Sequence, residues 1–297
     1  MSSLDLLELE PSRQSNDYNL LPLRIYSQAY SDHLFFISHH WHEEIEIIYI
    51  ESGEFLIHIN WNPYTAKAGE VFFINSAEVH QITATTENSI HYAILFNPKI
   101  LKFEWHDPLG QKPLLSLINQ RLKFLPHVND QTELNSQIIK EIKHIIAVEE
   151  NNKPSRTMMI KSALLEIFSL LIDHESVVKE EIILKKDRDK AKLARKIMTY
   201  VNDFYSQKLS IEKIANELNL SPSHFSKVFK TIFEQTFVEY LTNVRIEKAC
   251  IFLGQTDMFI IDISLNVGFD NFSYFIKKFK KIKGMTPGAY RQSIQSL

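Results

Sequence analysis

The sequence contains little cysteine and little glycine, and it has no long apolar run. Its 297 residues include one cysteine, Cys250, and seven glycines scattered singly. A single cysteine forms neither an internal disulfide framework nor a cysteine-based zinc site, and scattered glycines form no phosphate-binding loop. No apolar stretch approaches the ~20 residues of a membrane span, and residues 1–19 lack the basic start and apolar run of a secretory signal. We therefore expect a cytoplasmic protein with no membrane partner.

The formal net charge of −3 is small, but the charge is unevenly distributed. Residues 1–184 carry 14 Lys and Arg and 25 Asp and Glu, a net charge of −11, whereas residues 185–297 carry 19 and 11, a net charge of +8. Eleven of the 12 histidines lie in the acidic part. The length suits about two domains. The asymmetry therefore predicts an acidic, histidine-rich domain and a basic domain with different partners.

Residues 24–110 are predicted to form a β-barrel. Short segments rich in Ile, Phe and Tyr predict strands at 35–38, 44–51, 54–60, 71–75, 79–83 and 90–96. Turn signals separate several of them, at Ser52–Gly53, Asn62–Pro63 and Ala68–Gly69. Closely spaced short strands are typical of a sandwich or small barrel. The preceding residues 1–23 are predicted to be an N-terminal arm.

From residue 111 the apolar period becomes helical. Three apolar faces are spaced for helices, at 114–122, 134–146 and 159–171. The third is apolar around much of its circumference, which favours a partner on at least one side. We interpret residues 111–175 as a helical dimerisation segment, with packing against the barrel as the alternative. The charge-rich residues 176–190 are predicted to be a linker.

Residues 191–297 are predicted to be all-helical, with two helix-turn-helix units. In the first, Ser210 caps a helix over 211–218, Asn219 takes the left-handed turn position, and Ser221 caps a second helix. A short helix, a tight turn and a second helix with a polar face form a DNA-reading unit.

The second unit repeats the arrangement. A helix over 260–265 is followed by Gly268 at the turn and by a helix predicted to begin at Asp270. An amphipathic helix, about 237–253, joins the two units, and Cys250 is expected to pack there as a small hydrophobe. Two units on a net charge of +8 favour DNA binding over ordinary helical hairpins.

These residues resemble the DNA-binding domain of the AraC/XylS transcription regulators. The stretches that carry the resemblance are Ile211–Ala215, Leu220–Lys230, Arg245–Ala249, Val267–Asp270, Ser273–Phe275, Phe279–Lys281, Gly284–Pro287 and Tyr290–Arg291. Ser264 stands where the family usually has Ala. The resemblance implies that two recognition helices enter successive major grooves on one face of the DNA, roughly 10 bp apart.

Matching by motif position gives the residues expected to face DNA. They are Ser223, His224, Ser226 and Lys227 in the first unit and Asn271, Phe272, Ser273 and Lys277 in the second. Lys227 is the candidate for a guanine edge, whereas Lys278, Lys280 and Lys281 are expected to touch phosphate or solvent.

The histidine-rich segment resembles the cupin barrel. The carriers are His40-x-His42 followed by Glu46 and Gly53, and then Gly69 followed by His80. In metal-binding cupins the matching side chains converge, which implies a divalent metal (Zn, Fe, Mn or Ni) at His40, His42, Glu46 and His80. The second motif departs from the pattern, with Asn75 in place of the usual Pro and Ala77 in place of the usual Gly.

The alternative to a metal is an organic effector, because regulators of this family commonly keep such histidines without one. Aromatic and hydrogen-bonding side chains suit a sugar or a similar polar small molecule. The side chains expected at the barrel mouth are Trp41, His42, Glu44, Glu46, His58, Trp61 and His80.

The sequence thus predicts an α+β multidomain protein. A cupin-like barrel with helices would precede an all-α domain with two helix-turn-helix units joined by a linker helix. We expect a ligand-responsive transcription regulator, acting as a homodimer on double-stranded DNA, with RNA polymerase as a further partner if it activates. No enzyme is predicted, because the sequence supports neither a Ser/His/Asp nor a Cys/His nucleophile pattern, and Cys250 lies in the basic part, far in sequence from the histidines. A metal-dependent cupin enzyme fused to a DNA-binding domain is the alternative.

Overall fold

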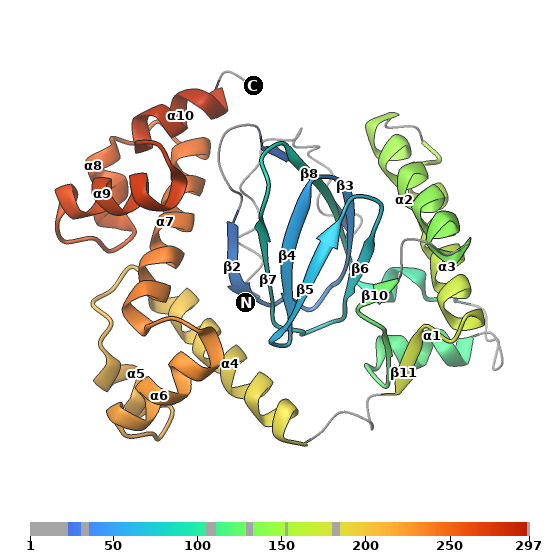
Figure 1. Ribbon diagram of the computed structural model, residues 1–297, viewed down its shortest axis with the longest axis horizontal. Coiled ribbons are helices and arrows are strands. Elements are labelled where there is room, and N and C mark those ends of the chain that lie inside the picture. The colour runs from blue at the N-terminus through green and yellow to red at the C-terminus, as the bar shows by residue number, and fades with distance from the viewer. Residues whose placement is uncertain are drawn as a thin grey trace. The chain divides into compact units, whose positions relative to one another are not determined.

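The computed structural model describes residues 23–30, 36–104, 111–128, 133–151, 154–179 and 185–295 (Figure 1). It confirms the predicted fold class, an antiparallel β domain followed by a helical domain. The predicted arm lies outside the described residues except for Leu23. In the part of the chain that is described, no helix has the length and apolar character needed to cross a bilayer.

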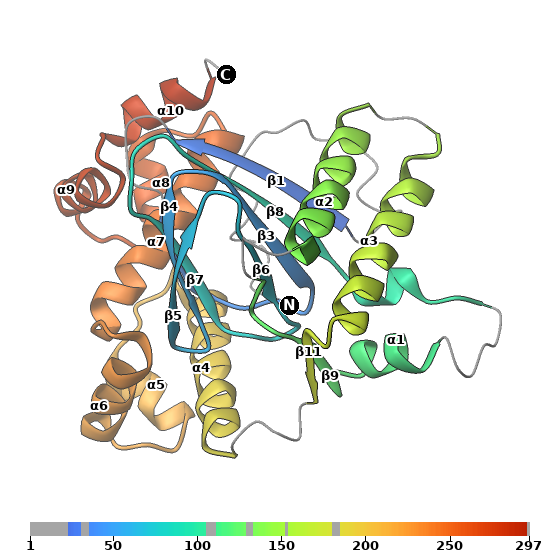
Figure 2. The same cartoon turned by 45° about the vertical axis from the view of Figure 1, so that its right-hand side comes forward.

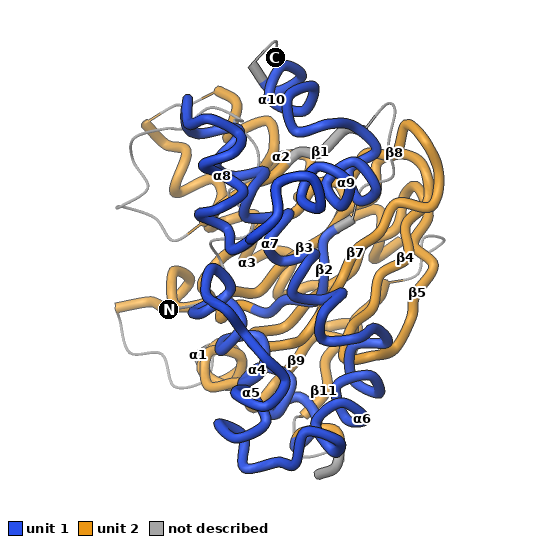
Figure 3. Tube along the Cα trace, turned by 90° about the vertical axis from the view of Figure 1, so that its left-hand side faces the viewer, with its two compact units in different colours: residues 1–13, 37–41, 189–297 blue, residues 14–36, 42–188 orange. Residues whose placement is uncertain are grey.

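Contacts between residues divide the chain into two compact units (Figure 3). Among the described residues, the β-rich unit spans 23–188 apart from 37–41. The helical unit combines residues 37–41 with 189–295. The division falls inside the predicted linker, 176–190, which itself contains a short strand and the first turns of a helix.

The strands form two larger sheets and one small one. The five-stranded sheet has the order β1 (Leu23–Tyr30), β8 (Ser89–Phe96), β3 (Ile45–Ser52), β6 (Val71–Ile74) and β10 (His127–Val128). The four-stranded sheet has the order β2 (Phe36–His40), β7 (His80–Ala84), β4 (Glu54–Ile59) and β5 (Asn62–Lys67). The small sheet pairs β11 (Val177–Lys179) with β9 (Leu122–Phe124).

Strand β3 is buried on both of its faces, which explains its nearly continuous apolar sequence. Ile45, Ile47 and Tyr49 belong to a core shared with helices, and Glu46 and Ile48 point to the opposite face because side chains alternate along a strand. This second face lies towards the four-stranded sheet, since Glu46 contacts His80 of β7. The barrel interior is therefore the space between the two larger sheets.

Helices cover the outer face of the five-stranded sheet (Figure 2). They are α1 (Gln111–Ile118), α2 (Glu133–Asn151) and α3 (Arg156–Asp173), and a short 3₁₀ helix, Pro98–Leu101, precedes them. Helix α3 buries six of its side chains within this unit, which accounts for much of its apolar circumference. Met158, which is 75% exposed, is the large apolar side chain that this helix leaves in solvent among its described residues.

The predicted turn at Asn62–Pro63 is wrong by two residues. The β4–β5 turn is formed by Asn60 and Trp61, both in the left-handed region with φ of 47° and 70°, and Asn62 already begins β5. Two left-handed residues give the hairpin turn whose twist matches that of the flanking strands. The turn chemistry therefore lies in Asn60, which tolerates this conformation.

The helical unit consists of seven helices among the described residues. They are α4 (Lys185–Phe204), α5 (Ile211–Glu217), α6 (Pro222–Phe233), α7 (Phe237–Gln255), α8 (Ile260–Asn266), α9 (Phe272–Lys283) and α10 (Pro287–Gln295). The expected caps form, because the hydroxyls of Ser210 and Ser221 accept hydrogen bonds from the N–H groups of Lys213 and His224. The predicted start of α9 at Asp270 is wrong: Asn271 is the cap, since its side chain accepts from Tyr274 N.

Helix α7 is not amphipathic as predicted, because buried residues occur all around it. Its first half packs on α6, where the ring of Phe237 lies 5.7 Å from that of Phe225. Its second half shares a core with α8 and α9, and Cys250 packs in that core as expected. The helix is therefore covered from two sides by the two helix-turn-helix units that it joins.

A segment of β2, residues 37–40, also belongs to the helical unit. Ser38 donates from its backbone N–H and its hydroxyl to the carboxylate of Glu247 on α7, at 3.1 and 2.9 Å. Glu247 is fully buried, and this burial raises its pKa above the ordinary value despite the bonds from Ser38 and the nearby lysines. The two bonds satisfy a carboxyl group that would otherwise be costly to bury.

The turn residue Gly268 meets a steric requirement as well as a conformational one. Its φ is 92°, and an added Cβ would lie 2.8 Å from the carbonyl oxygen of Ser206 and 2.9 Å from that of Tyr205. Arg245 of α7 holds the same loop by donating to the carbonyl oxygens of Tyr205 and Gln207, at 2.8 and 2.9 Å. The second turn and the α4–α5 loop are thus packed backbone to backbone.

We predict that Gly268→Ala lowers the free energy of unfolding of the helical unit by at least ~1–3 kcal/mol, the usual cost of a strained left-handed residue. Urea unfolding followed by circular dichroism measures it. Gly254→Ala in α7 is the control, because its Cβ would make an ordinary contact of 3.8 Å with the side chain of Ile294 and a helical Gly→Ala change is neutral or stabilising. Equal unfolding free energies for the two variants would contradict the prediction.

Candidate functional site

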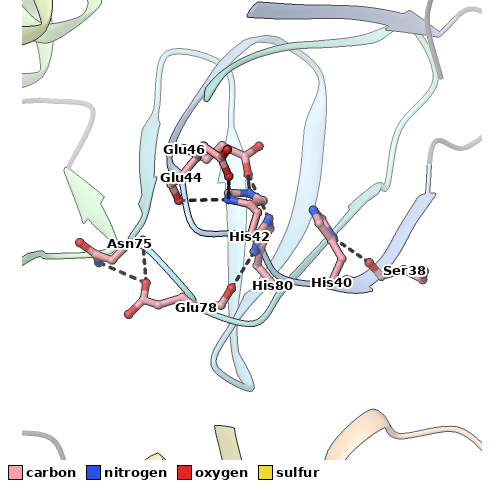
Figure 4. A network of polar contacts seen from close by, with 8 residues as sticks. All are labelled: Ser38, His40, His42, Glu44, Glu46, Asn75, Glu78 and His80. Atoms are coloured by element: carbon pink, nitrogen blue, oxygen red, sulfur yellow. Dashed lines mark hydrogen bonds and ion pairs between the residues drawn. The ribbon is translucent and has the colours of Figure 1, made fainter. Parts of the chain in front are cut away.

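Three charged or titratable side chains meet in the barrel interior (Figure 4). Glu46 lies on β3, His80 is the first residue of β7, and His42 precedes β3. All three are buried, with 5%, 1% and 1% of their surfaces exposed. The sequence motif is thus brought together in space, as a polar group inside an apolar barrel.

One carboxylate oxygen of Glu46 contacts both histidines. Its Oε2 atom lies 3.1 Å from Nε2 of His42 and 3.0 Å from Nε2 of His80. Burial alone would raise the pKa of Glu46, but the hydrogen bonds and positive charges of the two histidines hold it well below the ordinary value. Glu46 is therefore an anion in this arrangement.

The backbone determines which nitrogen of each ring faces the interior. Nδ1 of His42 donates to the carbonyl oxygen of Glu44, and Nδ1 of His80 donates to that of Glu78, both at 3.0 Å. Nε2 of each ring is consequently the atom directed at Glu46. This nitrogen either carries a proton, giving an imidazolium that donates to Glu46, or offers a lone pair to a cation.

His40 is the fourth member of the predicted metal set. Its Nδ1 donates to the carbonyl oxygen of Ser38 at 3.0 Å, the same pattern as in the other two histidines. One ligand atom from each of His40, His42, Glu46 and His80 lies within 4.8 Å of the others. Two atoms bound to one ion at ~2.1 Å lie at most ~4.2 Å apart, so a small contraction would suit a metal.

The donor set also fits a metal chemically. Three imidazoles and a carboxylate suit a divalent transition metal, and metal-bound histidines commonly donate their other nitrogen to a backbone carbonyl. The sequence motif predicted the ligands, but the carbonyl partners depend on backbone geometry and had no sequence signal.

Other side chains of the predicted effector pocket have different positions. The carboxylate of Glu44 lies 3.9 Å from Nδ1 of His42. The guanidinium group of Arg195 lies over the ring of Trp41, with its Cζ atom 6.0 Å from the ring centroid. Trp61 lies in the β4–β5 turn. His58 pairs with Gln81, so it points to the opposite face of the sheet from His80 and does not join the group.

His91 was missed by the sequence reasoning, and it lies in the barrel interior. It is buried on β8, pairs with Ile50 of β3, and its ring centroid lies 5.0 Å from that of Phe55. Burial lowers its pKa to about 4, although the charge of Glu46 acts in the opposite direction. His91 is therefore a neutral polar side chain beside the group, and alternation from Ser89 along β8 could have revealed it.

The predicted DNA-facing residues lie on exposed faces of α6 and α9. Phe225 and Phe229 of α6 are fully buried, and Phe275 and Phe279 of α9 occupy the equivalent positions. The outward residues are Ser223, His224, Ser226 and Lys227 on α6 and Asn271, Phe272, Ser273 and Lys277 at α9, and all are exposed. Asn219 and Gly268 adopt the left-handed turns expected before these helices, with φ of 55° and 92°.

Some of these residues also have a structural role. The hydroxyl of Ser226 donates to the carbonyl oxygen of Pro222 at 2.9 Å, and the side-chain oxygen of Asn271 caps α9. The lysines Lys227 and Lys277 remain as the cationic members of the two faces.

Comparisons with known proteins agree with both domains. A model described as an AraC-like ligand-binding domain matches residues 20–168, and one described as a helix-turn-helix domain matches residues 214–293. YdeC of Bacillus subtilis, described as an uncharacterized HTH-type transcriptional regulator, is 25% identical over 280 residues, 92% of either chain. The melibiose operon regulatory protein of Escherichia coli is 26% identical over 270 residues, 86% of this chain and 84% of its own.

A solved structure has a similar fold. A variant of apo ToxT from Vibrio cholerae matches 91% of this chain and 97% of its own, with 16% sequence identity and a TM-score of 0.52. The ligand-binding model alone covers half of the chain. The chain therefore belongs to the AraC family of transcriptional regulators, with a ligand-binding domain in front of a helix-turn-helix domain.

Proposed function

We propose that this regulator senses a polar small molecule at the group formed by His42, Glu46 and His80, and that the bound molecule changes its binding to DNA. The observation that supports this most is the buried charge itself. A carboxylate and two imidazoles inside an apolar barrel are costly unless they are paired, and they offer a ligand both donors and acceptors.

A sugar is the effector that we favour. Sugar hydroxyl groups can donate to Glu46 and accept from the histidines, and apolar neighbours such as Phe55 can lie against a sugar ring. The name of the melibiose operon regulatory protein associates a full-length relative with a sugar operon. His91 extends the polar lining of the same interior.

We also propose that the group can hold a divalent metal such as Zn²⁺, with His40 as the fourth ligand. The carbonyl-bonded Nδ1 atoms support this, because they keep Nε2 of His42 and His80 directed at Glu46. A bound metal would supply positive charge and vacant positions to which an effector could attach. The enzyme alternative is not favoured, because the full-length relatives are regulators.

DNA recognition is assigned to the outward faces of α6 and α9. Lys227 is proposed to reach a base edge, and Lys277 supports it from the second helix. The proposed dimer uses the helical segment α1–α3, where Met158 is exposed. RNA polymerase would be a further partner if the protein activates transcription.

We predict that Lys227→Ala weakens binding to the DNA upstream of the gene by ~1–3 kcal/mol and relaxes base choice at one position. Fluorescence anisotropy at several salt concentrations measures this change, because neutralised phosphates make affinity salt-dependent. Lys192→Ala removes the same charge from an exposed site on α4 and is the control. If both variants lose the same affinity, Lys227 has no special contact.

We predict that a bound sugar raises the melting temperature of the full chain. A ligand at 100 times its Kd stabilises the folded state by about 2.7 kcal/mol. A thermal-shift screen with mono- and disaccharides measures the effect. His80→Ala should abolish it and His58→Ala should keep it, because His58 lies on the other face of the sheet. A shift that survives in His80→Ala would place the effector elsewhere.

We predict that the wild-type chain retains stoichiometric metal after incubation with Zn²⁺ and dialysis, as measured by elemental analysis. His80→Ala should lower the affinity at least ~10-fold, since even the loss of an outer-shell partner has an effect of this size. His58→Ala should bind like the wild type. Absence of metal from the wild-type chain with Zn²⁺, Fe²⁺ and Mn²⁺ would remove the metal proposal and leave the organic effector.

A further inference from the structure

The turn between β6 and β7, residues 75–78, contacts both sensor histidines. The N–H of Ala77 donates to the carbonyl oxygen of His42 at 2.8 Å. The carbonyl oxygen of Glu78 accepts from Nδ1 of His80 at 3.0 Å (Figure 4). The turn is therefore bonded to the ring of His80 and to the backbone of His42. A ligand that repositions the ring of His80 acts on this turn directly, and one that shifts the backbone of His42 acts on it through Ala77.

The opposite side of the turn holds strand β9. The side-chain oxygen of Asn75 accepts from Phe124 N at 2.8 Å, and its amide nitrogen donates to the carbonyl oxygen of Phe124 at 3.0 Å. Asn75 thus bonds both backbone groups of one residue 49 positions away. The Asn75 and Phe124 side chains are buried, so water does not compete for these bonds.

Glu78 holds the asparagine in place. Its Oε2 atom accepts from the backbone N–H and the amide nitrogen of Asn75, at 2.9 and 3.1 Å. Its other oxygen lies 3.8 Å from Nζ of Lys123, which is also on β9. The turn and β9 are therefore joined by neutral hydrogen bonds and by one ion pair.

Strand β9 leads to the segment that precedes the helical unit. It pairs with β11, with Phe124 opposite Val177, and Leu125 N donates to the carbonyl oxygen of Ser176 at 3.0 Å. After β11 ends at Lys179, the next described element is α4. A continuous set of hydrogen bonds thus runs from His80 through the turn and β9 to β11.

The departure from the cupin pattern at position 75 is what makes this path possible. A proline at position 75 would have neither the N–H that reaches Glu78 nor an amide to bond Phe124. Ala77 adopts a φ of 62°, which favours glycine, so the turn keeps a strained residue whose N–H bonds His42.

We propose that Asn75 and Glu78 are positioning residues that couple the state of the sensor group to β9 and β11. This inference rests on the proposed sensor role of that group. Substituting a sensor histidine should raise the rate of amide exchange in β11. Removing the Asn75 side chain should break the hydrogen bonds between the turn and β9 while leaving the histidines in place.

Amide hydrogen exchange of the full chain, measured by mass spectrometry, tests the coupling without DNA. Peptides that cover residues 122–128 and 174–179 report on β9 and β11, and the β1–β8 pair is the internal reference for global stability. His80→Ala should speed exchange in these peptides at least ~5-fold, the lower end of typical coupling between sites. His58→Ala, on the other face of the sheet, should leave their exchange unchanged.

The same substitution in an Asn75→Ala background decides the path. In that background His80→Ala should speed exchange in β9 and β11 by less than a further ~2-fold, because the hydrogen bonds between the turn and β9 are already absent. Glu78→Gln, which keeps the shape of the side chain, is the second variant if Asn75→Ala does not fold. The proposal is overturned if His80→Ala leaves β9 and β11 unchanged, or if its effect is equally large without Asn75.

Added Zn²⁺ provides a second test in the opposite direction. If it binds, it should slow exchange of β9 and β11 in the wild type and not in Asn75→Ala, and protection confined to residues 40–80 would overturn the proposal. If Zn²⁺ does not bind, the metal proposal fails and the His80→Ala comparison alone decides the coupling. Failure of DNA binding to respond to an effector would count against the proposed function while leaving the exchange result intact.

Discussion

The barrel depends on the pairing of one buried carboxylate. Glu46 lies on the face of β3 that also carries Ile48 and Ile50, both fully buried. A charge in such surroundings costs several kcal/mol unless partners compensate it, and removing one partner of a buried pair typically costs ~3–5 kcal/mol. His42 and His80 must therefore remain close to Glu46, which fixes the chain before β3 and the start of β7. The two sheets are held together at this point by polar contacts, and elsewhere by apolar packing.

The helical unit meets a different requirement, that of keeping α6 and α9, the two helices proposed to contact DNA, in a fixed position relative to each other. Helix α7 does this because its two halves are buried in the cores of different helix-turn-helix units. Arg245 adds a connection to the α4–α5 loop, against which Gly268 packs. Rigid connection matters for the proposed reading of two grooves, because the spacing of the grooves is set by the DNA.

Much of the fold followed from periodicity and from residues with special conformational roles. The strands from β2 to β8, apart from β5, and the helices α1–α3 were predicted within a few residues, and the positions of Ser210, Asn219, Ser221 and Gly268 gave the two units. Strands β9, β10 and β11 have two or three residues, too few for any period to appear. The amphipathic reading of α7 failed because a helix covered from two sides has no solvent-facing stripe.

The site was predictable only as far as motif spacing reaches. Spacing identified His40, His42, Glu46 and His80. His58, which was expected at the barrel mouth for its polar ring and not from a motif, is placed on the other face by strand alternation. His91 belongs to no motif and was found through its strand register.

The departure at position 75 shows the opposite error, since in sequence it resembles decay of a motif. In the structure, Asn75 makes two hydrogen bonds to Phe124 and donates to Glu78. A proline has neither a backbone N–H nor a side-chain amide and would make none of these bonds. A lost consensus residue can therefore mark a gained contact, and the distinction requires knowing which strand lies beside the turn.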